Sequence, residues 1–170
     1  MALELAELSR LDMACNLKDW RRAVIESARA RPDVPARLPD DWAFEVQIAL
    51  NCLLISCVRE AHGRAATLLV RHAFEQTLLE QVATAGASLE LLERVATLQS
   101  LRFATFFAAL ERGDPDPDST ALPRRLAQAI VARETPTLAD PLAASFEEFR
   151  SAMAKRVATY ALAEGLARVE

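Results

Sequence analysis

Glycine and proline are rare in this chain, and they fall between long segments with helical periodicity. The 170 residues include 4 glycines and 8 prolines, whereas about a third of all residues are alanine or leucine, which are strong helix formers. Gly63, Gly86 and Gly113 each follow a segment whose apolar residues recur every three or four positions. Glycine is favoured just after a helix end because it adopts the left-handed conformation at least cost. The pattern predicts an all-α fold.

The periodic segments predict a bundle of about six helices. We expect helices over residues 3–30 (with a break near Asn16), 41–62, 64–85, 89–112, 123–133 and 141–169, and loops over 31–40 and 113–122. The turns at Gly63 and Gly86 are short, so the second, third and fourth helices should form antiparallel hairpins. The whole chain, residues 1–170, is then one all-helical domain.

Several residues mark helix starts, and one segment marks the centre of the bundle. Ser88 is expected to cap the helix that begins at Leu89, and Asp140 with Pro141 has the pattern of an N-cap followed by the first helical residue. Ser145 and the glutamate three residues later have the spacing of a capping box. Residues 43–58 are apolar around most of the helix circumference, which predicts a buried central helix.

The N-terminal residues and the cysteines favour a cytoplasmic protein. Glu4 and Glu7 stand where a signal peptide would carry basic residues, and no uninterrupted apolar run reaches the roughly 18 residues of a membrane span. The three cysteines, Cys15, Cys52 and Cys57, are an odd number and predict reduced, buried thiols. We therefore expect no export and no contact with a membrane.

The charge balance does not favour nucleic acid as a partner. The chain has 20 basic and 24 acidic residues, a net charge of -4, whereas proteins that grip nucleic acid usually carry a basic surplus. Four arginines could still contact phosphates: Arg21, Arg22, Arg29 and Arg31. Acidic residues lie close to them in the sequence, so a solvated helix face is the favoured interpretation.

A few polar residues fall near the predicted core: Asn51, His72, Glu75 and Gln76. A fold-back at Gly63 would bring His72 and Glu75 close to Asn51. One interpretation is a buried polar contact that satisfies these groups. The other is a ligand-sensing bundle, in which Asn51, His72 and Gln76 orient a small apolar molecule. A single histidine–glutamate pair is too few ligands for a metal, so no metal or other cofactor is expected.

No catalytic motif is present in the sequence. A Gly-x-Ser-x-Gly nucleophile elbow is missing. Asp114, Asp116 and Asp118 alternate as in a calcium-binding loop, but Ser119 and Arg125 occupy the positions that require glycine and glutamate. The chain is therefore not expected to be an enzyme.

The strongest functional signal is a surplus of apolar surface. The helices over 41–62 and 89–112 are each apolar beyond the one stripe that a peripheral helix needs. We expect a binding face on the latter, formed by Leu98, Phe103, Phe106, Phe107 and Leu110, unless these residues are internal to the bundle. The sequence thus favours a non-catalytic protein-interaction module (an adaptor, regulator or inhibitor subunit) that pairs with itself as a homodimer or with another protein. The alternatives are the ligand-sensing bundle and a small subunit of a nucleoprotein complex.

Overall fold

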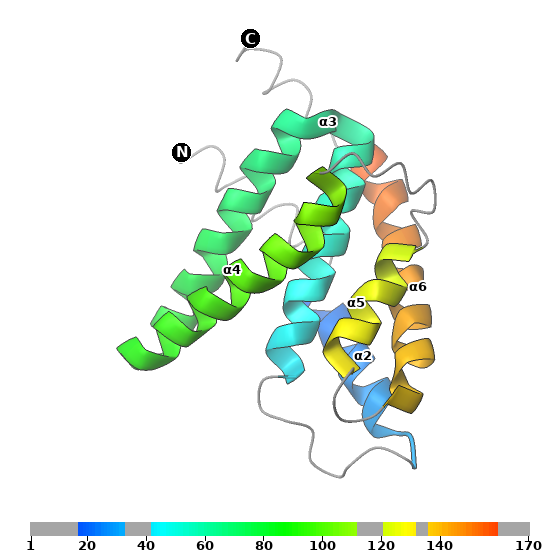
Figure 1. Cartoon of the computed structure of the whole chain (residues 1–170), viewed down its shortest axis with the longest axis horizontal. Helices are drawn as coiled ribbons and strands as arrows, with labels where there is room; N and C mark the ends of the chain where they lie inside the picture. The colour runs from blue at the N-terminus through cyan, green and yellow to red at the C-terminus, as the bar shows by residue number, and fades with distance from the viewer. Residues whose placement is uncertain (1–16, 33–41, 112–120, 132–135, 160–170) are drawn as a thin grey trace.

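The computed structural model describes residues 17–32, 42–111, 121–131 and 136–159, and all regular structure in these ranges is helical. The helices pack together into a bundle (Figure 1), which confirms the predicted all-α fold. They are α2 (Leu17–Arg29), α3 (Trp42–Thr84), α4 (Leu89–Glu111), α5 (Ala121–Val131) and α6 (Ala139–Thr159), with a short 3₁₀ helix at Pro136–Leu138.

Helix α3 consists of two limbs that meet at Gly63. The backbone of Gly63 is not helical, with φ +81° and ψ −172°, and α3 doubles back at this point (Figure 1). The first limb covers residues 42–62 and the second limb covers 64–84. The Thr67 hydroxyl donates a hydrogen bond of 2.9 Å to the Gly63 carbonyl in the first turn of the second limb. The predicted helix boundary and antiparallel hairpin at Gly63 are therefore confirmed.

A second reversal at Gly86 joins the second limb of α3 to α4. Gly86 has a φ of +80°, and its N–H donates to the Ala83 carbonyl at 3.0 Å. The N–H of Ala87 donates to the Val82 carbonyl at 3.3 Å. These two bonds form a Schellman motif, the usual way in which a left-handed glycine ends a helix. The second limb and α4 thus form a further hairpin, which we call the 64–111 hairpin.

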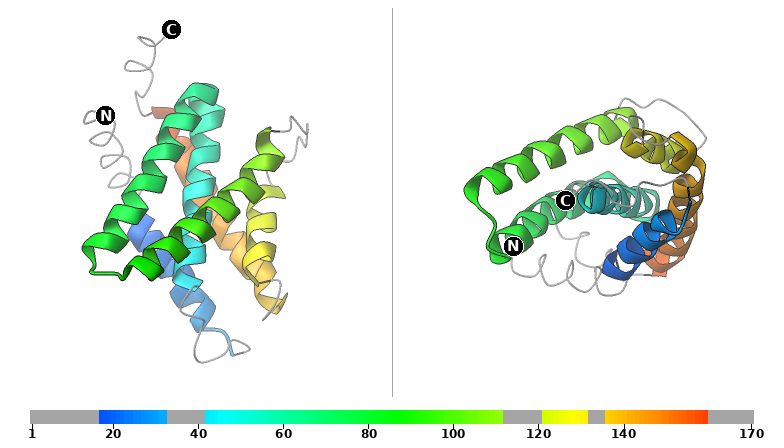
Figure 2. Two further views of the ribbon diagram at one scale, coloured as in Figure 1. Left: turned by 60° about the vertical axis from the view of Figure 1, so that its left-hand side comes forward. Right: turned by 90° about the horizontal axis from the view of Figure 1, so that it is seen from below.

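The first limb of α3 is the centre of the bundle. It packs against α2, α5 and α6, and α4 covers it on another side (Figure 2). Every residue from Ile48 to Val58 is buried, as predicted for a central helix. The ring of Trp20 on α2 meets the edge of the Phe149 ring on α6, with centroids 5.4 Å apart. Full burial of a large apolar side chain contributes about 1.5–3 kcal/mol, so this helix supplies much of the stability.

The stretch Trp42–Leu68 is long and apolar enough to cross a membrane by length and composition. The expectation based on uninterrupted apolar runs missed it, because isolated polar residues such as Asn51 interrupt the stretch. Within the bundle, 72% of its most apolar window is buried. The central helix of a globular protein passes the same test, so this stretch is only weak evidence for a membrane segment.

Three predicted helix starts can be compared with the structure. The N–H of Leu91 donates to the Ser88 hydroxyl at 3.3 Å, which confirms that cap. The capping box at Ser145 is wrong, because Ser145 lies inside α6 and its hydroxyl donates to the Pro141 carbonyl at 3.2 Å. Asp140 is the second residue of α6 rather than its cap.

Helix α5 begins earlier than predicted. It starts at Ala121, inside the expected loop 113–122, so Pro123 is its third residue. A proline is tolerated in the first helical turn, where its missing N–H would have no partner within the helix. The same rule accommodates Pro141 in α6. The predicted helical segments over 3–16 and 160–169, and the end of the helix at Gly113, lie outside the described residues.

Candidate functional site

Exposed leucines gather on the 64–111 hairpin. Among the described side chains, the large hydrophobic ones that are exposed are Leu68 on the second limb (50% exposed) and Leu89, Leu91 and Leu101 on α4 (73%, 45% and 58%). The hairpin extends away from α5 and α6 towards the Gly86 turn (Figures 1 and 2). This part of the bundle therefore presents apolar surface to its surroundings.

Three leucines lie along one face of α4, with the exposed Arg94 between the first two, and we call this face the outer stripe. Leu91 and Leu101 are exposed and Leu98, between them, is half-buried. Their spacing of seven and three residues places them within about 80° of one another on the helix. Only Leu98 of these three belongs to the binding face predicted from the sequence. Its spacing from Leu91 and Leu101 was the signal that could have identified the stripe.

The other residues of the predicted binding face have different positions. Phe103 is fully buried in the main core, so its side chain is not on a free surface. It shares a helical face with Val95 and Gln99, both also buried. This inner face is rotated by about 110° from the outer stripe. The side chains of Phe106, Phe107 and Leu110 lie outside the described residues, so the predicted face is reduced to Leu98.

The inner face of α4 contains a buried amide without a partner. Gln99 is only 2% exposed, and neither its Oε1 nor its Nε2 has a hydrogen-bond partner. A buried polar group left unpaired typically costs about 1–3 kcal/mol. The packing of α4 on α3 is therefore less favourable at this residue than an apolar contact would be.

Polar contacts attach the 64–111 hairpin to the first limb. The Arg102 guanidinium donates two hydrogen bonds to the Glu45 carboxylate, Nε to Oε2 at 2.8 Å and Nη2 to Oε1 at 2.9 Å. Within the hairpin, the Arg71 guanidinium lies 5.7 Å from the centre of the Phe103 ring and binds Glu75 at 3.1 Å. Cations over aromatic rings and bidentate arginine–carboxylate pairs both favour one fixed geometry.

The four residues of the predicted ligand site do not gather in one place. Asn51 is buried and accepts a hydrogen bond of 3.0 Å from the Gln47 amide. His72 and Gln76, by contrast, are exposed, and Glu75 is half-buried beside Arg71. The expectation that His72 and Gln76 face the core is wrong, because these residues lie on the face of the second limb opposite its buried face.

A small hollow lies between α2 and the start of α6. Val24, Arg31, Trp42 and Leu142 contribute to its lining, and its volume is about 10 Å³. That volume holds about one water molecule, whereas pockets for small organic ligands measure roughly 300 Å³ or more. The hollow does not touch α4 or the second limb of α3, where the sequence placed the ligand.

The predicted phosphate-contacting arginines are all on or just after α2. Arg22 and Arg29 are exposed, and Arg31 is half-buried at the small hollow. Arg21 donates a hydrogen bond of 3.3 Å to the Gln47 side chain, which links α2 to α3. Only part of this group is therefore free to meet a phosphate backbone.

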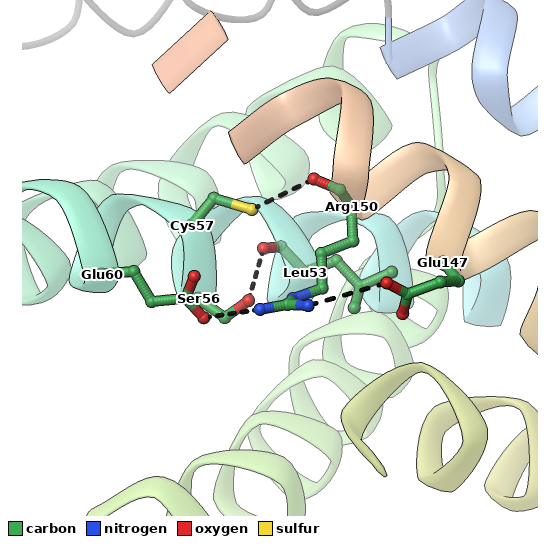
Figure 3. Close-up of polar contacts among 6 residues, drawn as sticks. All are labelled: Leu53, Ser56, Cys57, Glu60, Glu147 and Arg150. Carbon is green, nitrogen blue, oxygen red and sulfur yellow. Dashed lines mark hydrogen bonds and ion pairs between the residues drawn. The ribbon is translucent and has the colours of Figure 1, made fainter. Parts of the chain in front are cut away.

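Polar contacts around Arg150 join the first limb of α3 to α6 (Figure 3). Arg150 binds Glu60 at 2.8 Å and Glu147 at 3.7 Å, and the Cys57 thiol donates to the Arg150 carbonyl at 3.7 Å. Burial alone would lower the pKa of Arg150, but the hydrogen bond and charge of Glu60, with Cys57 and Glu147, raise it overall. Arg150 therefore stays charged, and its contacts hold the first limb of α3 against α6.

The described part of the chain shows no metal site, and its Cys52 thiol is not activated. No three His, Cys, Asp or Glu residues there lie close enough together to hold a metal ion. Burial raises the pKa of the Cys52 thiol well above its ordinary value; the charge of Arg71 lowers it by less, and the charge of Glu75 raises it further. A thiol with a raised pKa is a poor nucleophile at neutral pH.

Comparisons with models of known protein families, with curated proteins and with solved structures found no match. The function is therefore inferred from the residues of the chain itself.

Proposed function

We propose that this protein is a non-catalytic helical interaction module that pairs with a second copy of itself through the outer stripe of α4. The observation that carries the proposal is the concentration of exposed large leucines on the 64–111 hairpin. Covering Leu91 and Leu101 in the stripe removes apolar surface from water, which is the main favourable term in protein association.

A second copy is the partner that the stripe fits best. In an antiparallel pairing of two α4 helices, Leu91 of one copy lies opposite Leu101 of the other, and Leu98 lies opposite the aliphatic stem of Arg94. One patch thus meets itself, as a two-fold symmetric interface requires. The three leucines are also spaced seven and three residues apart, which is the spacing of the core positions where two helices pack together.

Charge supports the antiparallel arrangement. Antiparallel pairing brings each helix terminus beside the oppositely charged terminus of its neighbour. Such complementarity favours this orientation over a parallel one.

Leucine substitutions on α4 test the proposal. A variant with Leu91→Ser and Leu101→Ser should lose the dimer while its circular dichroism stays helical. Leu89→Ser is the matched control, because Leu89 is the most exposed of the leucines but lies about 160° around the helix from Leu91. Size-exclusion chromatography with light scattering gives the masses.

Each outcome of this comparison is informative. A dimer that survives the double substitution in protein that has not been refolded contradicts the proposal. Loss of the dimer in both the double variant and the Leu89→Ser control also contradicts it, since the effect would then not be specific to the stripe. Binding of a nucleic-acid duplex that weakens steeply with salt would favour the nucleoprotein alternative instead.

A further inference from the structure

Gly63 has a backbone conformation that only glycine adopts readily. Its φ of +81° and ψ of −172° fall in a region that is essentially reserved for glycine. A Cβ added at this position would meet no atom within 4 Å, so only the backbone torsion discriminates against other residues. The residues before and after Gly63 are helical. A torsional change at this one residue would therefore join the two limbs of α3 into one helix.

The bundle side of this hinge is anchored. The His62 Nε2 lies 2.9 Å from the Val157 carbonyl of α6, and Glu60 binds Arg150 of the same helix at 2.8 Å. Both contacts lie within three residues of Gly63. The first limb is thus held in the bundle up to the hinge.

The hairpin side of the hinge packs on the core through one face. The second limb contributes Ala66, Val70, Ala73 and Phe74 to the core, and the inner face of α4 contributes Phe103. The same inner face also holds the unpaired Gln99 amide and the Arg102–Glu45 ion pair. The Arg102–Glu45 pair joins residues on opposite sides of Gly63, and the buried residues of the hairpin belong to the same core as the first limb.

We propose that two copies of this chain exchange their 64–111 hairpins, with Gly63 as the hinge. In the exchanged dimer each α3 is one helix of 43 residues, about 64 Å long, and its second limb packs on the first limb of the other copy. Every inner-face contact then forms again between chains, as in other domain-swapped dimers. The exchange goes beyond the proposed function, because it uses the inner face and does not need the outer stripe.

A substitution at the hinge tests this exchange. Gly63→Ala strains the folded-back conformation and favours a continuous helix, since alanine is the better helix former. Gly86→Ala is the matched control, because Gly86 has a similar φ and open surroundings but lies inside the exchanged hairpin. After refolding at equal concentration, the ratio of dimer to monomer should rise about tenfold or more for Gly63→Ala relative to Gly86→Ala. Equal ratios in the two folded variants would overturn the proposal.

A charge reversal at the Arg102–Glu45 pair gives a second test, which leaves Gly63 unchanged. Chains with Glu45→Arg and chains with Arg102→Glu each contain like charges when the hairpin folds back on its own chain. In an exchanged mixed dimer, both pairs are again opposite in charge. After the two chains are refolded together, native mass spectrometry should detect the mixed dimer in excess over either homodimer. Monomers alone, or homodimers in equal proportion, would overturn the exchange.

The exchange and the proposed function can fail separately. The mixing experiment is repeated on chains that also carry Leu91→Ser and Leu101→Ser. The mixed dimer should persist, since the inner face is intact. Its disappearance would show that the dimer depends on the outer stripe and would overturn the exchange. In protein that has not been refolded, loss of the dimer through the leucine substitutions concerns only the proposed function, because the exchange is tested on chains that fold together.

Discussion

Arg102 of α4 and Glu45 at the start of α3 form a bidentate ion pair, with two N···O distances of 2.8 and 2.9 Å across 57 residues of sequence. Both side chains are partly shielded from water by the surrounding helices. Hydrogen bonds between charged groups in such a setting contribute more than those of a fully solvated surface pair. This contact helps to fix the angle at which the 64–111 hairpin leaves the bundle.

A double-mutant cycle measures the strength of this pair. We expect Glu45→Gln, Arg102→Gln and the double variant to give a coupling free energy of about 1 kcal/mol in urea unfolding. The reason is that each single substitution leaves the other charge without its partner. If the two single substitutions change the free energy of unfolding additively, the pair does not hold α4 against the first limb.

The unpaired Gln99 amide predicts a stabilising substitution. Gln99→Leu replaces a buried group that lacks hydrogen bonds with an apolar one of similar size, and we expect the free energy of unfolding to rise by about 1–2 kcal/mol. Asn51→Leu is the control, because the Asn51 amide is equally buried but accepts a hydrogen bond, and this variant should be less stable than wild type. Urea unfolding of both variants makes the comparison. A Gln99→Leu variant less stable than wild type would contradict the prediction.

Arg150 is predicted to stabilise the protein more by its apolar stem than by its charge. Its side chain is 12% exposed, whereas its partner Glu60 is 50% exposed, so solvent screens the ion pair. Arg150→Met keeps most of the stem and should cost about 1 kcal/mol or less. Arg150→Ala loses the stem as well and should cost about 2–3 kcal/mol. If thermal or urea unfolding shows equal losses for the two variants, the charge is the dominant contribution.

The buried Cys52 thiol predicts a loss of stability at alkaline pH. Its pKa in the folded protein lies well above the ordinary value of 9.0, so between these two values the unfolded chain has lost a proton that the folded chain keeps. The contribution of Cys52 to the free energy of unfolding is complete below pH 9.0. It declines as the pH rises above that value, by up to about 1.4 kcal/mol per pH unit. Cys52→Ala should show a shallower decline than wild type above this pH. If the free energies of unfolding of the two proteins fall equally with pH, burial of the Cys52 thiol is not the cause of the decline.

Residues with a local role were predictable from the sequence, and residues whose role depends on packing between helices were not. The breaks at Gly63 and Gly86 and the cap at Ser88 follow from backbone chemistry at single positions, and the structure confirms them. The direction of a helix face depends on how neighbouring helices rotate against it. Periodicity alone left open whether Phe103 lies on a binding face or inside the bundle, and the structure buries it. Periodicity also placed His72 in the core, which is wrong because His72 is exposed.

The outer stripe illustrates the same limit. Helix α4 carries two sets of apolar residues, and the sequence does not show which set the rest of the chain covers. The structure resolves this, because Val95 and Phe103 are buried whereas Leu91 and Leu101 are exposed. The proposed binding face is the set of apolar residues that the core leaves uncovered, so it can be identified only once the buried residues are known.

Sedimentation equilibrium of the wild-type protein tests the central claim most directly, because it measures mass in solution as a function of concentration. The account predicts a reversible dimer of twice the 18.7 kDa chain mass, favoured as the concentration rises. A single species of 18.7 kDa at every concentration up to the millimolar range would contradict it.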